Sequence, residues 1–216
     1  MRLTREESRE QTQQRLLEAA QSVIARKGLA ATSVEDIAAA AGYTRGAFYS
    51  NFRSKGDLFI ELLRQDHRRA HDAMSEILQT DLAPAQLEQR VSEMYARLYR
   101  SNECFMNWTE ARMLAARDGR FRNKLNALML EKRDYIAAFI EQFYQRLGLP
   151  PSVPSPQLAM GFMSLLEGVK LFRLSSPQEM TDEAAESILM LFVDALIRLA
   201  RLRAAEGASQ RAAITG

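Results

Sequence analysis

The apolar positions of this chain recur at intervals of three and four residues from near the N-terminus to about residue 200. This spacing places apolar side chains on one face of an α-helix, whereas a half-buried strand requires alternation of apolar and polar positions. No alternating run of useful length is present, and most glycines and prolines fall between the periodic segments. The pattern therefore predicts an all-α fold.

The first two helices are predicted from periodicity and from the residues at their ends. Residues 5–27 form an amphipathic segment, which Gly28 is expected to end, because glycine readily adopts the left-handed conformation found there. Thr32 and Glu35 then have the spacing of a capping box. A short second helix is therefore expected directly behind them, at residues 34–41.

A third and very short helix is predicted at residues 45–51, with Thr44 as its N-cap. Phe48 and Phe52 lie four residues apart and are expected to anchor it to the core. A short amphipathic helix, a tight turn containing glycine and a second short helix form a helix-turn-helix. The second helix of this motif usually enters the major groove of DNA.

The outer face of this third helix carries groups suited to a polyanion. Arg45 can reach guanine or a phosphate through its guanidinium, and Gly46 lets the backbone approach closely. Tyr49 and Ser50 can donate hydroxyl hydrogen bonds to phosphates or base edges. Lys55 begins the next helix, where backbone N–H groups also attract phosphate. The alternative is a solvated surface on a helical interaction or adaptor protein that binds no DNA.

The rest of the chain predicts six further helices, at about residues 54–78, 86–101, 104–117, 120–147, 157–174 and 182–204. The stretch LGLPPSVPSP holds four of the six prolines and marks a clear break between two of them. We expect a DNA-binding domain at residues 1–55, a larger helical domain at 56–205 and a small, polar, disordered tail at 206–216.

Composition narrows the class of protein. Hydrophobic residues make up 47% of the chain and charged residues 26%, which is typical of a globular protein with a core. The formal charge of +2 is mild, so any basic surface must be local. The charged N-terminus does not look like a signal peptide, and no apolar run approaches the ~18–20 residues of a membrane helix. We therefore expect a cytoplasmic protein without membrane contact.

Enzyme and metal chemistry find little support in the sequence. There is no glycine-rich phosphate loop, no nucleophile elbow and no cluster of metal ligands, so neither catalysis nor a cofactor is expected. His67 and His71 are four residues apart, but they lie among arginines and acidic residues, which favours a solvated helix face over a metal site. Cys104, the single cysteine, cannot form an internal disulfide.

A resemblance to a known family sharpens this interpretation. Between residues 15 and 63 the sequence resembles the tetracycline-repressor (TetR) family of bacterial transcription factors. The matching segments are LLEAA (16–20), KG (27–28), TSVEDIA (32–38), AGYTRGAFYSNF (41–52) and SKGDLF (54–59). The resemblance implies an all-helical homodimer, in which an N-terminal module binds a palindromic operator and a larger C-terminal domain binds a small inducer.

The resemblance also implies a set of DNA contacts. The positions that match family contacts are Thr44, Arg45, Gly46, Tyr49, Ser50, Asn51 and Lys55, with Thr32 and Ser33 as a further phosphate contact. Many members carry an aromatic residue and then a histidine where this chain has Ser50 and Asn51. The small pair keeps the capacity for hydrogen bonds, but the operator sequence cannot be carried over from those members.

The last two helices are expected to form a homodimer interface. Gly161, Ser164 and Gly168 make a seam of small residues that lets another helix approach closely. The last helix is apolar over much of its circumference. Two such helices and their symmetry mates would form a four-helix interface, as in the family, although both could instead belong to the core of a monomer.

The middle helices are rich in methionine and aromatic residues, which suit a pocket for a largely apolar inducer. The candidate ligand contacts are Met74, Tyr95, Phe105, Trp108, Phe139, Phe162 and Met163. For each of them alone, an ordinary core position is the alternative. Glu110 belongs to a W-x-E stretch that resembles a structural feature of many relatives. We therefore predict a ligand-responsive transcriptional repressor whose inducer displaces the fourth helix.

Overall fold

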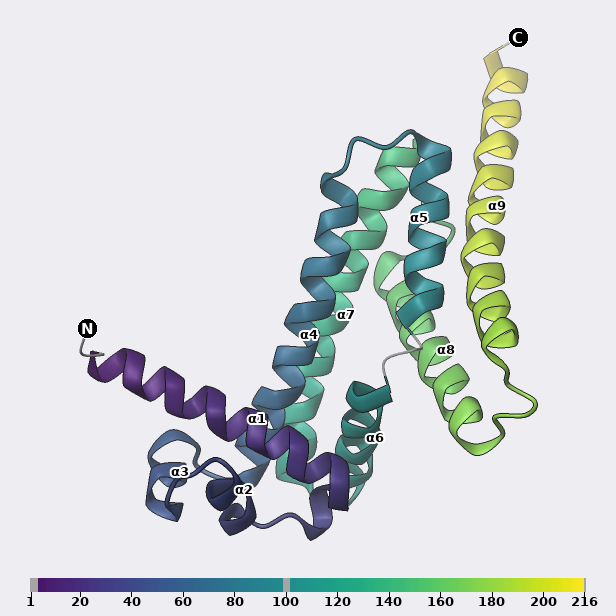
Figure 1. Ribbon diagram of the computed structural model, residues 1–216. Coiled ribbons are helices and arrows are strands. Elements are labelled where there is room, and N and C mark those ends of the chain that lie inside the picture. Colours follow the sequence, from purple (N-terminus) through teal and green to yellow (C-terminus); the bar gives the residue numbers. More distant parts are fainter. Residues whose placement is uncertain (1–3, 99–101, 216) are drawn as a thin grey trace. The chain divides into compact units, whose positions relative to one another are not determined.

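The computed structural model describes residues 4–98 and 102–215, without the side chains of residues 69, 70, 73, 102–104 and 209–215. The described residues form α-helices and connecting loops and contain no strand, so the predicted all-α fold is confirmed (Figure 1). The helices are α1 (Arg5–Ala31), α2 (Val34–Ala40), α3 (Arg45–Asn51), α4 (Lys55–Gln79), α5 (Pro84–Arg97), α6 (Asn102–Arg117), α7 (Gly119–Leu147), α8 (Ser155–Ser175) and α9 (Asp182–Thr215).

The chain packs as two compact units that do not follow the sequence order. The first is built from residues 1–69 and 102–129, and the second from residues 70–101 and 130–216. Helices α4 and α7 therefore contribute residues to both units. Helix α6 and the start of α7 pack in the same unit as the helix-turn-helix, whereas the sequence predicts a domain boundary after residue 55.

The core of the first unit joins the helix-turn-helix to α4, α6 and α7. Phe48 of α3 and Phe59 of α4 are fully buried in it, together with Leu16 of α1 and Ile37 of α2. Leu128 of α7 belongs to the same cluster. Burial of these apolar side chains, worth roughly 1.5–3 kcal/mol each, stabilises α2 and α3, which have seven residues each and are too short to persist alone.

The junction between α1 and α2 differs from the prediction by one residue. Gly28 has a φ of +79° and interrupts α1, as expected of a glycine stop, but one more turn follows it. Thr32 is only 1% exposed, and its Oγ1 donates to the Gly28 carbonyl at 2.7 Å. Thr32 thus ends α1, and the predicted Thr32–Glu35 capping box is wrong. Ser33 and Asp36 form the capping box of α2 instead.

The second unit is built around α5, α7, α8 and α9. Helices α5 and α9, which are far apart in the sequence, lie side by side in this unit (Figure 1), and α8 also contacts α9. Leu87 of α5, Ala159 of α8 and Leu189 of α9 are buried at its centre. No helix among the described residues is long and apolar enough to cross a membrane.

Helix α9 is longer than predicted. It continues to Thr215, whereas the sequence predicts a disordered tail from residue 206. Alanine, glutamate, glutamine and arginine are good helix formers, and they occupy much of this segment. Their small and polar character, from which disorder was expected, is equally compatible with a solvated helix.

Candidate nucleic-acid interface

The turn between α2 and α3 is fixed by backbone hydrogen bonds. Tyr43 N–H donates to the Ala38 carbonyl at 2.8 Å, and Gly42 N–H donates to the Ala39 carbonyl at 3.1 Å. This is the Schellman pattern, and it needs the positive φ of +75° that Gly42 adopts. The chain is thereby redirected within two residues, which sets the angle at which α3 leaves α2.

Helix α3 is capped and anchored as the sequence predicts. The Thr44 hydroxyl accepts from Ala47 N–H at 3.2 Å, and Phe48 is completely buried. The Phe48 and Phe52 rings lie 5.8 Å apart. A Cβ on Gly46 would meet only the Thr44 hydroxyl, at 3.6 Å. Glycine is therefore not needed for internal packing at this position, and its outer side is left clear.

Arg45 and Tyr49 form an exposed pair on the outer face of α3. The Arg45 guanidinium carbon lies 5.5 Å from the centroid of the Tyr49 ring, and its Nη1 lies 2.9 Å from Glu35 Oε1. Tyr49 is 47% exposed and rests edge-on against Phe48. The hydrogen bond to Tyr49 and the charge of Glu35 raise the pKa of Arg45, which stays cationic. Because so exposed an ion pair is weak, a phosphate or base can replace Glu35.

Ser50 and Asn51 are turned back onto their own helix. The Ser50 hydroxyl and the Asn51 amide both donate to the Ala47 carbonyl, each at 2.8 Å. The Asn51 amide also lies 3.3 Å from the Ser50 hydroxyl. Ser50 is exposed and Asn51 is half-buried. A contact from Asn51 to DNA would first require its side chain to leave these partners.

Three other predicted DNA contacts have structural roles. Lys55 Nζ donates to the carbonyls of Leu29 and Thr32, at 2.8 and 2.7 Å. Burial lowers the pKa of Lys55. Ser33 is exposed, but its hydroxyl is held by Asp36 in the capping box of α2. The burial of Thr32 and the internal contacts of Lys55 contradict the idea that their side chains point outward to phosphate.

Glu110 completes this internal network, and its partner could not be read from the sequence. Its carboxylate accepts the backbone N–H of Leu29, directly after the interruption of α1 at Gly28. A Cβ on Gly28 would lie 3.2 Å from Glu110 Oε1. The W-x-E stretch marks Glu110 as structural, but only the packing of α6 against α1 identifies the peptide group that it binds.

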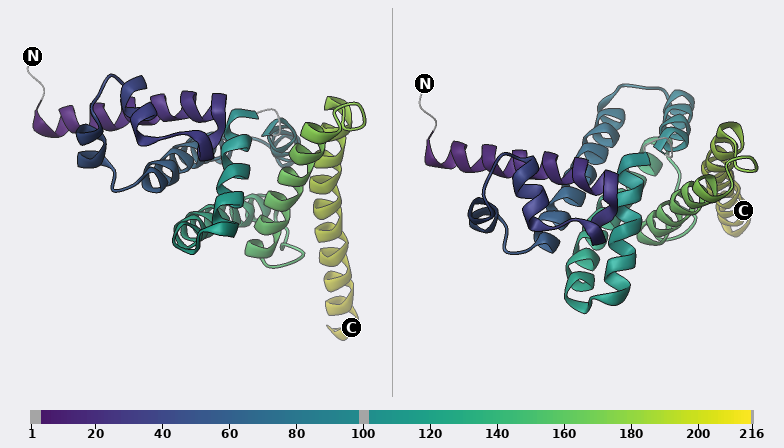
Figure 2. Two further views of the ribbon diagram at one scale, coloured as in Figure 1. Left: turned by 90° about the horizontal axis from the view of Figure 1, so that it is seen from below. Right: turned by 60° about the horizontal axis from the view of Figure 1, so that its bottom comes forward.

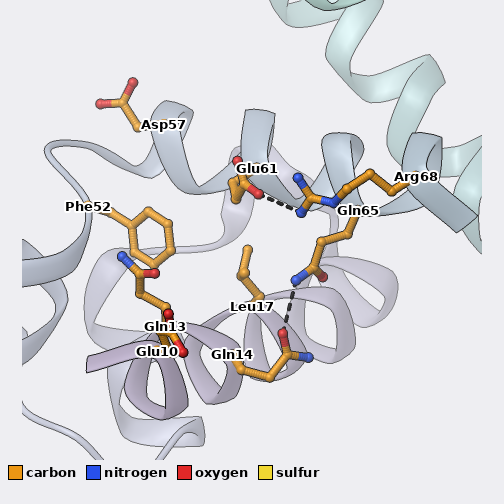
Figure 3. Close-up of a pocket in the computed structure, with 9 residues that line it drawn as sticks. All are labelled: Glu10, Gln13, Gln14, Leu17, Phe52, Asp57, Glu61, Gln65 and Arg68. Carbon is orange, nitrogen blue, oxygen red and sulfur yellow. Dashed lines mark hydrogen bonds and ion pairs between the residues drawn. The ribbon is translucent and has the colours of Figure 1, made fainter. Parts of the chain in front are cut away.

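A polar hollow of about 540 Å³ lies between α1 and α4 within the first unit (Figure 3). Leu17 and Phe52 supply its apolar surface. Gln65 donates to Gln14 across it at 3.0 Å, and Arg68 donates to Glu61 at 2.7 Å. The hollow is lined by none of the seven residues predicted to bind an inducer.

The predicted ligand residues are divided between the two units. Phe105 and Trp108 belong to α6 in the first unit, where Trp108 joins the core. The other five lie in the second unit: Met74, Tyr95, Phe139, Phe162 and Met163. Met74, Tyr95 and Phe139 are buried there, and Phe162 and Met163 are half-buried. The structure therefore brings together only part of the predicted set.

Tyr95 is the polar member of this group in the second unit. Its hydroxyl donates to the Phe162 carbonyl at 2.7 Å, and its ring meets the Phe162 ring edge-on at 4.9 Å. Phe162 in turn meets Phe192 of α9 at 5.0 Å. Burial raises the pKa of the Tyr95 phenol, so this group remains a neutral hydrogen-bond donor.

His71, one of the two histidines of α4, contacts an aromatic ring and a carboxylate. The His71 ring lies 3.8 Å from the Tyr135 ring, and its Nδ1 lies 3.2 Å from Asp72 Oδ1. Among the described residues, no group of three or more His, Cys, Asp or Glu side chains is placed to hold a metal ion. Cys104 lies in the first turn of α6, outside the described side chains.

Helices α8 and α9 carry a broad exposed apolar surface. Its most exposed members are Leu191 of α9, at 67%, and Phe172 of α8, at 63%. The full set on the two helices is Met160, Leu171, Phe172, Leu174, Ile188, Met190, Leu191, Leu199 and Leu202. Gly161 faces Phe192, whereas a Cβ on Gly168 would meet nothing within 4 Å. The predicted seam of small residues thus faces α9 only at one end.

These features define an all-helical protein with a helix-turn-helix whose second helix exposes a cation, an aromatic ring and a hydroxyl. Residues 16–62 match the family described as bacterial regulatory proteins, tetR family. This module is therefore similar to the DNA-binding module of the TetR family.

Individual relatives support this at two levels. The HTH-type transcriptional regulator AcrR of Shigella flexneri is 44% identical over 61 residues, which cover 28% of this chain and only 28% of that regulator. A TetR-family transcriptional regulator from Rhodococcus sp. superposes with a TM-score of 0.73 at 24% identity, over 87% of this chain and 98% of that one. The regulator FadR from Bacillus subtilis, in complex with stearoyl-CoA, superposes with a TM-score of 0.63 at 18% identity, over 83% of this chain and 97% of that one. At such identities the two structures show a shared fold.

Proposed function

We propose that this protein is a transcriptional regulator of the repressor class that binds a palindromic DNA operator as a homodimer. The observation that carries the proposal is the outer face of α3. Arg45 and Tyr49 are exposed there on a helix that Phe48 fixes to the core, so the helix can enter a major groove without losing its packing. Thr44, Gly46 and Ser50 lie on the same exposed surface. We exclude Thr32 and Lys55 from this contact surface.

A homodimer is part of the proposal because a single helix-turn-helix reads only one half-site. The exposed apolar side chains of α8 and α9 support pairing with a second copy, since clustered exposed apolar surface often marks a protein–protein interface. In a dimer that reads a palindrome, the two α3 helices would lie about 34–36 Å apart, which is one turn of DNA.

Release by a small, largely apolar inducer is the least direct part of the proposal. The buried aromatic residues around Tyr95 offer apolar contacts and one neutral hydroxyl, and FadR, which shares the fold, binds stearoyl-CoA. Helix α4 contributes to both units, so its displacement would reach α3. A coupling of ~1–3 kcal/mol would weaken operator binding about 5- to 150-fold. A ligand bound by the second unit that leaves operator affinity unchanged would contradict this step.

The DNA proposal is tested with duplexes selected from a randomised library by the wild-type chain. We expect Arg45→Ala and Tyr49→Ala to weaken binding of the selected duplex by ~1–3 kcal/mol each and to relax its sequence preference. Arg26→Ala is the matched control, because Arg26 is an exposed arginine of α1 in the same unit. The relatives are regulators rather than enzymes, which leaves a helical adaptor as the alternative. An adaptor would select no duplex, and that result would overturn the proposal.

A further inference from the structure

A second basic surface lies in the first unit, where α6 ends and α7 begins. Residues 112–124 contain four arginines and one lysine but a single acidic residue, Asp118. Asp118 Oδ1 accepts the backbone N–H groups of Arg120 and Phe121, at 2.8 and 3.1 Å. This carboxylate thus caps the start of α7. With five cationic residues and one acidic residue, the corner carries a larger positive formal charge than the +2 of the whole chain.

The corner is packed against the first turn of α4. The Phe121 ring stacks on Phe59, with 6.1 Å between ring centroids. A Cβ on Gly56 would lie 3.4 Å from the Phe121 ring. Lys124 forms an ion pair with Asp57 in the same turn. Since α4 begins four residues after the end of α3, this packing ties the corner to the recognition helix (Figure 2).

Three cations line this side of the corner: Arg53, Arg120 and Lys124, which we call the corner strip. Arg120 and Lys124 are one turn apart on α7, about 6 Å along its axis, and so share a face. Burial opposes the ionisation of Asp57, but hydrogen bonds from Lys124 and Ser54 still lower its pKa, and the charge of Arg53 adds to the effect. One carboxylate therefore faces two of the three cations.

The strip retains a net positive charge after this pairing. Arg53 and Arg120 are exposed, and neither side chain forms an ion pair with any residue that the structure describes. Arg45, in contrast, is paired with Glu35, and Arg68 with Glu61. Exposed cations on two adjacent helix starts suit an extended polyanion better than a single small anion, which would need a shaped and partly buried site.

We infer that the corner strip binds the phosphate backbone of the DNA beside the segment that α3 reads. This inference rests on the proposed function, since it needs α3 to be placed in a groove. Arg53 follows α3 directly, and Phe121, next to Arg120, belongs to the same hydrophobic cluster as Phe48 of α3. Backbone contacts fix the register of a protein on the duplex and carry no sequence information. The strip therefore contributes affinity that is independent of the operator sequence and sensitive to salt.

The test compares the double variant Arg120→Gln/Lys124→Gln with the wild type on the selected duplex and on an unrelated mixed-sequence duplex of equal length. Each lost phosphate contact lowers the slope of log K against log salt by about 0.9, so we expect a decrease of about 1.8 on both duplexes. Affinity near 0.1 M salt should fall about tenfold or more, while the preference for the selected duplex stays unchanged.

Two matched variants accompany this measurement. The exchange Arg120→Lys/Lys124→Arg keeps both charges and should restore wild-type affinity and slope. Arg90→Gln/Arg97→Gln removes the same charge from α5 in the other unit and should leave both unchanged. Circular dichroism and thermal melting establish that each variant is folded. Asp57 keeps its hydrogen bond from Ser54 when Lys124 is replaced, and the Lys124–Asp57 pair is partly exposed, so its loss should cost only modest stability.

The outcomes separate this inference from the proposed function. If the wild type binds the selected duplex and Arg120→Gln/Lys124→Gln retains its salt slope, the strip does not contact DNA and the inference is wrong. The same holds if the charge-preserving exchange is as weak as the double glutamine variant. If the wild type binds no duplex, the proposed function fails, and the inference fails with it.

Discussion

Lys55 shows how one side chain can match a family contact and still point inward. Its Nζ donates to two carbonyls at the end of α1, those of Leu29 and Thr32. Glu110 accepts the N–H of Leu29, so both backbone polar groups of this residue are bound by side chains. Unpaired backbone groups are costly when removed from water, and the interruption of α1 at Gly28 would otherwise create them.

The structural role of Lys55 can be measured. Lys55→Met removes the Lys55 hydrogen bond from the Thr32 carbonyl and one of the two donors of the Leu29 carbonyl, and we expect the free energy of unfolding to fall by about 1–3 kcal/mol. Arg26→Gln, which removes an exposed cation nearby, should change it by less than about 0.5 kcal/mol. Denaturant titration of both variants provides the comparison. A Lys55→Met protein of wild-type stability, with a reduced salt slope in DNA binding, would restore the phosphate contact predicted from the sequence.

At the scale of elements, α2 and α3 have only seven residues each and depend on their ends and on the core. Asp36 caps α2 by accepting from the backbone N–H of Ser33 at 2.8 Å and from its hydroxyl at 2.6 Å. Lys27 of α1 donates to the same carboxylate at 2.5 Å. These contacts, with that of Lys27 first, hold the pKa of Asp36 well below its ordinary value of 3.8.

This shift predicts a dependence of stability on pH. Because the folded-state pKa of Asp36 is lowered, its contribution is present above the ordinary value of 3.8 and is lost as the pH falls towards the folded value. Between pH 7 and about pH 2.5, Asp36→Asn should therefore lose less of its free energy of unfolding than the wild type. Asp81→Asn, at an exposed loop position, is the control. Parallel pH profiles for the wild type and Asp36→Asn would show that the cap contributes nothing.

In the molecule as a whole, the apolar surface of α8 and α9 needs a partner to cover it. One face of α9 packs into the second unit through Leu189 and Val193, and another face exposes Ile188, Leu191 and Leu202. A helix that is apolar on two faces can bury both only by contacting a second partner. The proposed partner is a second copy of the same chain.

The proposed dimer is tested with Leu191→Glu/Leu202→Glu. Placing charges in an apolar interface should convert a dimer to a monomer and weaken binding to a palindromic duplex, because each copy would then hold one half-site alone. Met106→Glu is the control, since Met106 is also exposed, at 41%, but lies on α6 in the first unit. Sedimentation velocity reports the mass. A wild-type monomer, or a doubly substituted dimer, would exclude this interface.

Local sequence patterns were sufficient to predict the helices and the helix-turn-helix, with Arg45 and Tyr49 facing outward. These features depend on local periodicity, caps and turn residues, whose effects reach only a few positions along the chain. The packing of the helices, in contrast, was needed to show that Lys55 and Thr32 make internal contacts and that Trp108 lies in a different unit from Tyr95. It also placed the start of α7 beside the start of α4. Such contacts join residues far apart in sequence and depend on how whole helices pack, which local patterns do not encode.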